Sequence, residues 1–478
     1  MDSYPPITVL GPPPSGQPPV LTIAPRDGEA LAGELVAYHA YFAPLFQRAE
    51  QRHWALAYLQ GQLLDLDRKS IEPMALALAD GDVQAMQQFI SLGAWDDDRI
   101  LQQHQQLVAE TLGDASSGVL IIDGCDFPKQ GTHSVGVARQ WCGALGKVAN
   151  CQASVVACYA SQHGYTLIDR RLYMPEKWFT PAYQGRREQS GVPADLAFRT
   201  RPELAWDMIA SLHTRQVLPF QWVIGDEQFF HNPGLLDRIA AARLYYLAEV
   251  PHDTQGWLER PPLAVPPSTG KRGRPPQLER LLASAPPALR VDQVAAQLPP
   301  SAWRHYPIQE GAKGLLIGAF AFIRIVAVRD GLPGPDQWLV LRRSLGERPQ
   351  LKTYLSNAPA TTPHTTLVCM SGRRWPVELA ILECKSEVGM DQYEVRSWRG
   401  WHHHLTMTLL AHHFLVRQRC QLGEKSGGLN GAAGAPAVTG GLAQTASRRR
   451  NRDCAHPVHP RSELRGLLRA PEAPAAAA

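Results

Sequence analysis

The fold of this chain is constrained most by a series of short apolar runs between Gly118 and Val250, each bounded by turn residues. Such runs predict strands, because β-branched and aromatic side chains suit a buried pleated surface. The predicted strands are residues 119–122, 153–160, 166–173, 221–224 and 244–250. Apolar residues at helical spacing precede the last two strands, over residues 202–212 and 233–242. The predicted order of elements is therefore βββαβαβ.

This order indicates a mixed sheet. The first three predicted strands follow one another closely and are expected to be antiparallel. Parallel neighbours need a crossover connection, usually a helix, and the two predicted helices supply such connections before the fourth and fifth strands. The sequence thus predicts an α/β fold with a mixed sheet flanked by helices.

Composition divides the remainder of the chain. A Pro-rich lead (1–25) precedes a segment (26–115) in which apolar residues recur at helical spacing. Residues 251–346 shift to Pro, Gly and basic residues and then to β-type runs. A helical block is predicted from Pro376 to Arg417, and the tail (421–478) has too few large apolar residues to fold alone.

Several classes of protein are excluded by composition. With 44% apolar and 8% aromatic residues, the chain is typical of a globular protein. Its longest uncharged apolar run, Gly314 to Ile323, is shorter than the roughly 18–20 residues that cross a bilayer. The eight cysteines form no CxxC pair, which argues against a zinc ribbon and predicts mostly reduced core thiols. A net charge of +4 is too small to identify a nucleic-acid partner by itself.

Two acidic residues stand at the ends of predicted strands. Asp123 directly follows the first strand, and Asp226 stands just past the fourth. Open α/β sheets place ligand sites at such strand ends. Two carboxylates held close together repel unless they share a cation, so the pair indicates a hard divalent ion such as Mg²⁺. Taken singly, each Asp is more often a helix cap or a turn residue.

A third carboxylate occurs in the predicted final helical block. Arg374, Glu378 and Lys385 stand at spacings of four and seven, which places them on one face of a helix. An ordinary surface helix with salt bridges is the alternative explanation of this spacing.

The three acids lie in blocks that resemble the insertion-sequence transposases of the DDE superfamily, in the group whose third block carries Arg, Glu and Lys at this spacing. The resemblance runs from about Tyr41 to Leu415. Its main blocks are IIDGCDFPKQGTHSVGVARQWCGALGKVANCQ, QWVIGDEQF and RRWPVELAILECKSEVGMDQYEVRSWRGWHHHLTMTLLAHHFL. The segments LKTYLSNAP and YLQGQLLDLDRKSIEPMA are also similar to family sequence.

The resemblance implies an RNase H-like fold in which Asp123, Asp226 and Glu378 are the catalytic and metal-binding residues. Two Mg²⁺ ions, replaceable by Mn²⁺, are the implied cofactors. Rival ligands are Asp126, Glu383 and Glu387. Asp126 is a rival because Gly124 stands where the family usually has a second acid, directly after the first. Glu378 is preferred because it alone has the Arg and the Lys at the right spacing.

The implied domain organisation follows the compositional boundaries. The expected parts are a disordered lead (1–25), a helical N-terminal DNA-binding domain (26–115), a first part of the catalytic core (116–250), a β-rich insertion with a basic loop (251–346), a final part of the core with the third carboxylate (347–420), and a disordered or degenerate tail (421–478).

DNA is the implied partner, as the element's terminal inverted repeats and as target DNA. The expected DNA-binding residues are Arg374, Lys385, Lys129, Arg139, Arg396, Arg399, Trp398, Arg272 and Arg274. The last two lie in GKRGRPP, which resembles an AT-hook that enters the minor groove, a flexible basic loop being the alternative. Trp398 and Trp401 are expected either to stack on an unpaired base or to pack in the core.

The expected function is cleavage of DNA at element ends and strand transfer into target DNA, by a homodimer in the synaptic complex. The alternatives are an RNase H-like nuclease that cuts without joining and an inactive DNA-binding protein derived from a transposase. No membrane is expected among the partners, and the expected location is the cytoplasm, with the nucleoid. The histidines at 402–404, 412 and 413 have apolar neighbours, which favours a packed helix over a zinc site.

Overall fold

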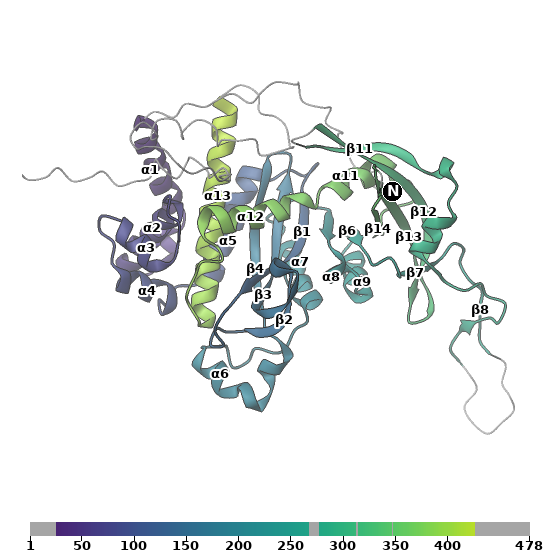
Figure 1. Ribbon diagram of the computed structural model, residues 1–478, viewed down its shortest axis with the longest axis horizontal. Helices are drawn as coiled ribbons and strands as arrows, with labels where there is room; N and C mark the ends of the chain where they lie inside the picture. The colour runs from purple at the N-terminus through teal and green to yellow at the C-terminus, as the bar shows by residue number, and fades with distance from the viewer. Residues whose placement is uncertain (1–24, 267–276, 312–313, 347, 426–478) are drawn as a thin grey trace, which may run out of the picture. The chain divides into compact units, whose positions relative to one another are not determined.

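A computed structural model of the chain describes residues 25–311, apart from 267–276, and residues 314–425, apart from 347 (Figure 1). These residues form two compact units, each assembled from separate stretches of chain. The first unit contains residues 119–122 and 220–374, and the second contains 25–118, 123–219 and 375–425. Strand β1 (Val119–Pro128) contributes its first four residues to the first unit and the rest to the second.

The amino-terminal part of the second unit is helical, as the spacing of its apolar residues predicts. Its helices are α1 (Pro25–Ala40), α2 (Ala49–Leu63), α3 (Ile71–Ala77), α4 (Val83–Ser91) and α5 (Asp97–Leu112), with a 3-10 turn at Ala43–Leu45. The Asp82 and Asp96 side chains accept hydrogen bonds from backbone N–H groups in the first turns of α4 and α5, so both helices begin at aspartate caps. Buried rings of Phe46, Phe89 and Trp95 pack between these helices.

The strands of the second unit form antiparallel hairpins. They are the later part of β1, then β2 (Ala138–Cys142), β3 (Lys147–Ser161) and β4 (Gly164–Tyr173). β3 pairs with β2 through residues 147–151 and with β4 through residues 153–161. The predicted second and third strands are confirmed, but the prediction of only three strands here was wrong. β2 was missed because it is a short ARQWC segment with only its two ends buried, so it carries no apolar run.

Long helices complete the second unit. Between β4 and the end of its central stretch lie three short 3-10 or α turns (Glu176–Phe179, Pro181–Tyr183 and Gln184–Gln189, the last being α6) and α7 (Arg201–Arg215). The last two helices are α12 (Trp375–Val388) and α13 (Trp398–Lys425). α13 contacts β4, α12, α2, α4 and α5 (Figure 1). The single helical block predicted from Pro376 to Arg417 was wrong, because Gly389 adopts a left-handed conformation and ends α12.

The first unit contains the parallel part of the fold. β1 pairs in parallel with β5 (Trp222–Gly225), and β5 pairs in parallel with β6 (Tyr245–Glu249). Helices α8 (Glu227–Phe230) and α9 (Pro233–Ala241) connect β5 to β6, as the crossover argument predicts. β14 (Leu351–Ser356) pairs antiparallel with β6, so the sheet is mixed.

The β-type runs predicted between residues 251 and 346 form one long hairpin in the first unit, β12 (Gly314–Arg329) with β13 (Leu332–Ser344). Its turn has positive φ at both Asp330 and Gly331, the conformation that Asp-Gly sequences favour in two-residue hairpins. Smaller elements surround it. They are β7 (Gln255–Trp257), β8 (Leu263–Ala264), β9 (Arg280–Leu281), β10 (Leu289–Arg290), α10 (Val291–Gln297), a 3-10 turn (Pro300–Ala302), β11 (Arg304–Gly311) and α11 (His364–Gly372).

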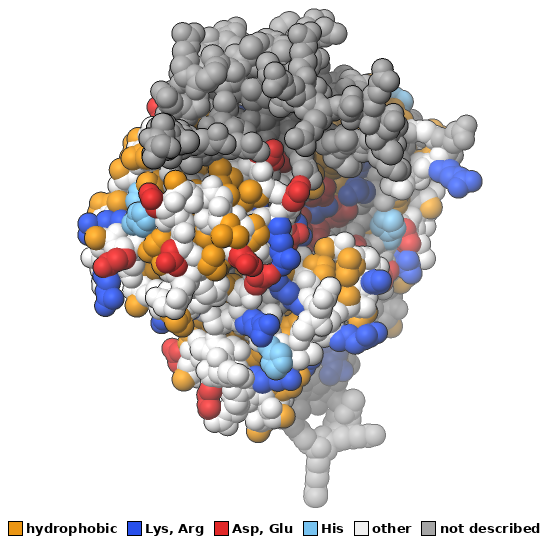
Figure 2. Space-filling view, turned by 60° about the vertical axis from the view of Figure 1, so that its left-hand side comes forward, with side chains coloured by type: hydrophobic (Ala, Val, Ile, Leu, Met, Phe, Trp, Pro, Cys, Tyr) orange, Lys and Arg blue, Asp and Glu red, His pale blue; other side chains and the backbone are white. Residues whose placement is uncertain are grey.

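Among the described helices, none is both long and apolar enough to cross a bilayer. The described cysteines are all free thiols, and five of the seven are buried. On the face drawn in Figure 2, Lys and Arg side chains are interspersed with Asp and Glu side chains, in keeping with the small net charge. Recognition of a charged partner therefore has to come from local groupings of side chains.

The turn at Gly389 generates a test of the fold. A Cβ at Gly389 would lie 2.6 Å from Cβ of the buried Lys69, and φ is +71° there. We expect Gly389→Ala to lower the free energy of unfolding by about 1–3 kcal/mol through overpacking and backbone strain.

Gly185→Ala is the control, because this exposed helical glycine has no atom within 4 Å of an added Cβ. It should raise stability by about 0.5–1 kcal/mol. Denaturant unfolding of both variants checks this, and equal effects would contradict it.

Candidate active site

The register of three parallel strands in the first unit places acidic residues at one edge. Ile122 is paired with Gly225, and Gly225 is paired with Ala248. Each of these residues is followed in the chain by an acid, namely Asp123, Asp226 and Glu249. The parallel pairing therefore ends level on all three strands, directly before the three acids, and α/β sheets place ligand sites at such an edge. β1 itself continues to Pro128, beyond the predicted strand 119–122, so Asp123 lies within it.

Asp226 is held by the turn that follows β5. Its Oδ1 accepts a hydrogen bond from the backbone N–H of Gln228 at 3.2 Å, which caps α8. The residue before it has to be glycine, because a Cβ at Gly225 would lie 2.0 Å from the Phe230 ring. Burial raises the pKa of Asp226, and the Arg374 guanidinium opposes that shift. A cation is thus what this carboxylate needs in order to stay ionised.

Glu249 was not among the predicted site residues. Its Oε1 lies 2.8 Å from Nζ of Lys352, and its Oε2 lies 3.8 Å from Nε of Arg374. These cations neutralise Glu249, which is thus already held in ion pairs within the protein. The signal that could have revealed it is the register itself, because the predicted strand at 244–250 has an acid, Glu249, next to its last residue.

A hollow of about 260 Å³ in the second unit brings three of the predicted site residues together, namely Asp123, Glu378 and Lys385. Asp123 and Asp126 reach it from β1, and Glu378 and Lys385 reach it from α12. It is completed by Gly124, Cys125, Gly143, Ala144 and Ile381. Glu378, Ile381 and Lys385 are spaced by three and four residues, so they share one face of α12. Arg374 was predicted to lie on this helix, which was wrong, because α12 begins at Trp375.

Hydrogen bonds fix the ends of the hollow. Oδ1 of Asp123 accepts from the backbone N–H of Gly124 at 2.7 Å, and Oδ2 of Asp126 accepts from that of Gly143 at 2.6 Å. Oδ1 of Asp126 is buried without a hydrogen-bond partner. Lys385 donates from Nζ to the backbone oxygen of Asp126 at 3.1 Å, which ties α12 to the end of β1.

The rival acids on α12 have different surroundings. Glu383 lies 2.9 Å from Nε2 of His412 and 2.9 Å from Nη1 of Arg419, and Tyr165 donates to it. Although burial opposes it, these partners lower the pKa of Glu383 to about 2, the His412 hydrogen bond being the largest of their effects. Glu383 is therefore a partly buried structural anion. Glu387 accepts a hydrogen bond from Ser386, and neither Glu383 nor Glu387 lines the hollow.

The other predicted DNA contacts differ in exposure. Arg139, Arg396 and Arg399 are exposed. Lys129 places Nζ 3.5 Å from the centroid of the Tyr393 ring, and burial lowers its pKa to about 8. Its ammonium is therefore already engaged by a protein partner.

The predicted stacking tryptophans lie on the last helix. Trp401 is fully buried in the core, so it has no exposed ring face, and Trp398 is half-buried against His402. Arg272 and Arg274, with the AT-hook prediction, lie outside the described residues.

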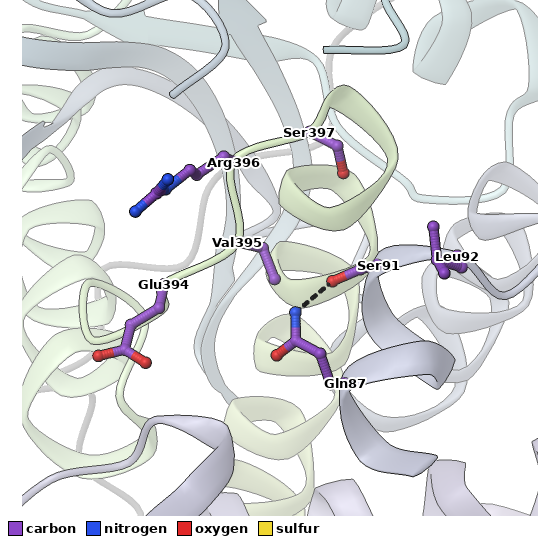
Figure 3. Close-up of a pocket in the computed structure, with 7 residues that line it drawn as sticks. All are labelled: Gln87, Ser91, Leu92, Glu394, Val395, Arg396 and Ser397. Atoms are coloured by element: carbon purple, nitrogen blue, oxygen red, sulfur yellow. Dashed lines mark hydrogen bonds between the residues drawn. The ribbon is translucent and has the colours of Figure 1, made fainter. Parts of the chain in front are cut away.

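A second hollow, of about 410 Å³, lies between the end of α4 and the segment that leads into α13 (Figure 3). On α4, Gln87 donates a hydrogen bond to Oγ of Ser91 at 2.7 Å. Arg396 and Glu394 point away from that pair (Figure 3). Glu394 is ion-paired with Arg68. The lining of this second hollow is completed by Leu92, Val395 and Ser397.

The histidines of α13 are part of the core. His403 lies within hydrogen-bond distance of the Ile90 and Trp95 carbonyl oxygens, and His404 lies 2.8 Å from the Tyr58 hydroxyl. Burial lowers the pKa of both His403 and His404 to about 4. The prediction of a packed helix is confirmed by these contacts.

The family follows from a comparison with known proteins. The profile described as DDE superfamily endonuclease matches residues 41–315, which is more than half of the chain. The chain belongs to the DDE superfamily endonucleases. Their name denotes nucleic-acid-cleaving enzymes, and the mixed α/β sheet flanked by helices agrees with the predicted RNase H-like class of fold.

A curated relative points the same way. It is the probable transposase for insertion sequence element IS701 of Microchaete diplosiphon, 26% identical over 208 residues. The aligned segment covers 43% of this chain and 50% of the relative, so the chain spans about half the length of that protein. The resemblance of this endonuclease to insertion-sequence transposases is confirmed, whereas the roles of its individual site residues stay predictions.

The structural role of Glu383 can be tested through the pH dependence of stability. Its folded pKa of about 2 lies below the ordinary 4.5, so its ionised form stabilises the fold at neutral pH, and this stabilisation is lost as pH falls from about 4.5 toward 2. We expect Glu383→Gln to cost about 3 kcal/mol near neutral pH and much less near pH 3, because it leaves Arg419 without its partly buried partner. Thermal unfolding across this range measures it, with Glu72→Gln, an exposed carboxylate, as the control. A loss that is independent of pH would contradict this role.

Proposed function

We propose that this protein is a DNA transposase that cleaves the ends of a mobile element and joins them to target DNA. The observation that carries the proposal is the register of β1 with β5, whose parallel pairing ends at Ile122 and Gly225, directly before Asp123 and Asp226. Glu378 is the third member, because it shares the hollow with Asp123. Membership of a family of endonucleases and the similarity to a probable transposase support this reading.

The residues present fit a divalent cation. Among the described residues, no three His, Cys, Asp or Glu side chains are grouped closely enough to hold a metal ion. The donors lining the hollow are carboxylate oxygens, the ligands that Mg²⁺ prefers, and one of them, Oδ1 of Asp126, is buried without a partner. We propose that Asp123, Asp226 and Glu378 hold two Mg²⁺ ions, with Mn²⁺ as a substitute.

A metal pair held in this way would activate the attacking oxygen and stabilise the leaving oxygen of an in-line displacement at phosphorus. The carboxylates hold the ions without reacting, so the same residues serve water as the nucleophile for cleavage and a 3′-hydroxyl as the nucleophile for joining. Arg374 offers a bidentate donor for a phosphate beside the scissile bond. Lys385 holds the Asp126 carbonyl, so its first role is to keep α12 against the end of β1.

DNA is the proposed partner, in the form of terminal inverted repeats and target DNA, with two copies of the chain in the synaptic complex. Arg139, Arg396 and Arg399 are the proposed phosphate contacts with exposed side chains. The proposed site of action is the nucleoid in the cytoplasm. A nuclease that cuts without joining would use the same residues. It differs from a transposase in that it does not join pre-cut DNA ends to a target.

The carboxylates are tested by substitution. We expect Asp123→Ala, Asp226→Ala and Glu378→Ala each to lower cleavage of element-end DNA on the order of a thousandfold or more, because each removes a metal ligand. Binding of the same DNA should change little, as measured by fluorescence anisotropy. Asp126→Asn separates the rivals on β1, and we expect at most a 10- to 100-fold loss from it, as for a residue that supports a ligand. Full activity of Asp123→Ala, or a complete loss in Asp126→Asn alone, would overturn the assignment.

Joining is tested with pre-cut ends. An oligonucleotide that ends in a 3′-hydroxyl at the element tip, incubated with Mg²⁺ and a supercoiled plasmid, should be joined covalently to the plasmid. Glu378→Ala serves as the negative control. A protein that cleaves uncut ends but never yields joined product would be the nuclease rather than the transposase.

A further inference from the structure

The hairpin of β2 and β3 carries exposed apolar side chains next to the carboxylate hollow. Trp141, Leu145 and Val148 are 55%, 47% and 51% exposed. Single exposed apolar residues are common, but three within eight residues form a patch. Trp141 is paired with Val148 across the two strands, so these two side chains lie side by side on one face of the hairpin.

The hairpin is anchored on its other face. Ala138, Cys142 and Cys151 are buried. On the Trp141 face, the side chain of Asn150, which is paired with Arg139, donates to the backbone oxygens of Lys129 and Gly131, at 2.7 and 2.8 Å. Trp141 is thus presented to solvent by a fixed support and not by a loose loop.

The tip of the same hairpin is a wall of the hollow. Gly143 and Ala144 line the hollow with Asp123 and Glu378, and the Gly143 N–H donates to the Asp126 carboxylate. Leu145 directly follows the wall residue Ala144, and Trp141 is two residues before the wall residue Gly143.

The charged residues of this hairpin indicate which kind of partner it binds. Between residues 138 and 150 the chain has two basic residues, Arg139 and Lys147, and no acidic residue. Both are exposed. Arg139 lies on the same face as Trp141, two residues along β2, whereas Lys147 is paired with Cys142 and lies on the opposite face. Basic side chains interleaved with an exposed aromatic ring suit a polyanion with flat bases better than an apolar protein surface.

We infer that the face of this hairpin that carries Arg139, Trp141 and Val148, with Leu145 in the adjoining turn, binds DNA at the reacting end, with Trp141 stacked on an unpaired base. The inference rests on the proposed function. It adds the substrate's conformation, because a stacking surface beside the carboxylates favours an end whose terminal bases are open. The sequence patterns had assigned stacking to Trp398 and Trp401, whose rings are half-buried and fully buried.

The test measures binding without cleavage, in EDTA. Two probes are used, a blunt duplex and the same duplex with a short single-stranded tail carrying 2-aminopurine. We expect wild-type protein to bind the tailed probe more tightly and to quench its fluorescence. Trp141→Leu keeps the apolar bulk but removes the stacking ring, and it should weaken binding of the tailed probe about tenfold while leaving the blunt probe unchanged. Trp141→Phe should retain most of the preference.

Leu76→Ala, a 75% exposed side chain on α3, is the surface control and should change neither affinity. Equal melting temperatures of the Trp141 variants and wild type show that a loss is not unfolding. Equal affinities of Trp141→Leu and wild-type protein for the tailed probe would overturn the inference. So would a change in sedimentation of Trp141→Leu without a change in DNA affinity, because the hairpin would then be a surface for self-association. Cleavage by Asp123→Ala would refute the proposed function separately, since these binding measurements do not depend on cleavage.

Discussion

The parallel pairing of β1 with β5 is the interaction on which the proposed chemistry depends. Four paired positions, from Val119 with Trp222 to Ile122 with Gly225, bring two segments about a hundred residues apart into register. Side chains on a strand alternate between faces, so a slip of the pairing by one residue would turn the side chains of one strand to the opposite face. Asp123 and Asp226 would then no longer lie at the same level of the sheet. The buried residues of β1 and β5 specify the register, and the positions of Asp123 and Asp226 follow from it.

The position of Glu378 depends on a different set of contacts. α12 is fixed by the partly buried Glu383 through His412 and Arg419, and by Lys385 through the Asp126 carbonyl. These two anchors lie on either side of Cys384, which is itself buried. Two ionisable residues close to the third carboxylate thus have structural partners, which leaves Glu378 as the α12 carboxylate that faces the hollow.

Much of this could be predicted from the sequence where a pattern was long and regular. The helices of residues 26–115, the strands around Asp123 and Asp226, and the crossover helices all follow from apolar spacing. Prediction failed where structure is set by contacts distant in sequence. β2 is recognisable only through its pairing with β3, and the end of α12 only through the backbone conformation of Gly389. The spacing of Arg374, Glu378 and Lys385 located the hollow's helix but could not show where that helix begins.

The candidate site shows the same division. Residue type and strand position sufficed to select Asp123, Asp226 and Glu378, and the family comparison supports the chemistry without testing the residues. Exposure could not be predicted for Lys129, Trp398 and Trp401, because it depends on which neighbours cover them. Glu249 escaped notice because its partners, Lys352 and Arg374, come from segments about a hundred residues later.

The central claim is that Asp123 on β1, Asp226 after β5 and Glu378 on α12 bind divalent metal together. Anomalous diffraction from crystals grown with Mn²⁺ tests it most directly. The account predicts metal peaks within about 2.3 Å of carboxylate oxygens of Asp123, Asp226 and Glu378. Metal bound only by Asp126, Glu383 or Glu249, or the absence of metal from all three proposed ligands at saturating Mn²⁺, would contradict it.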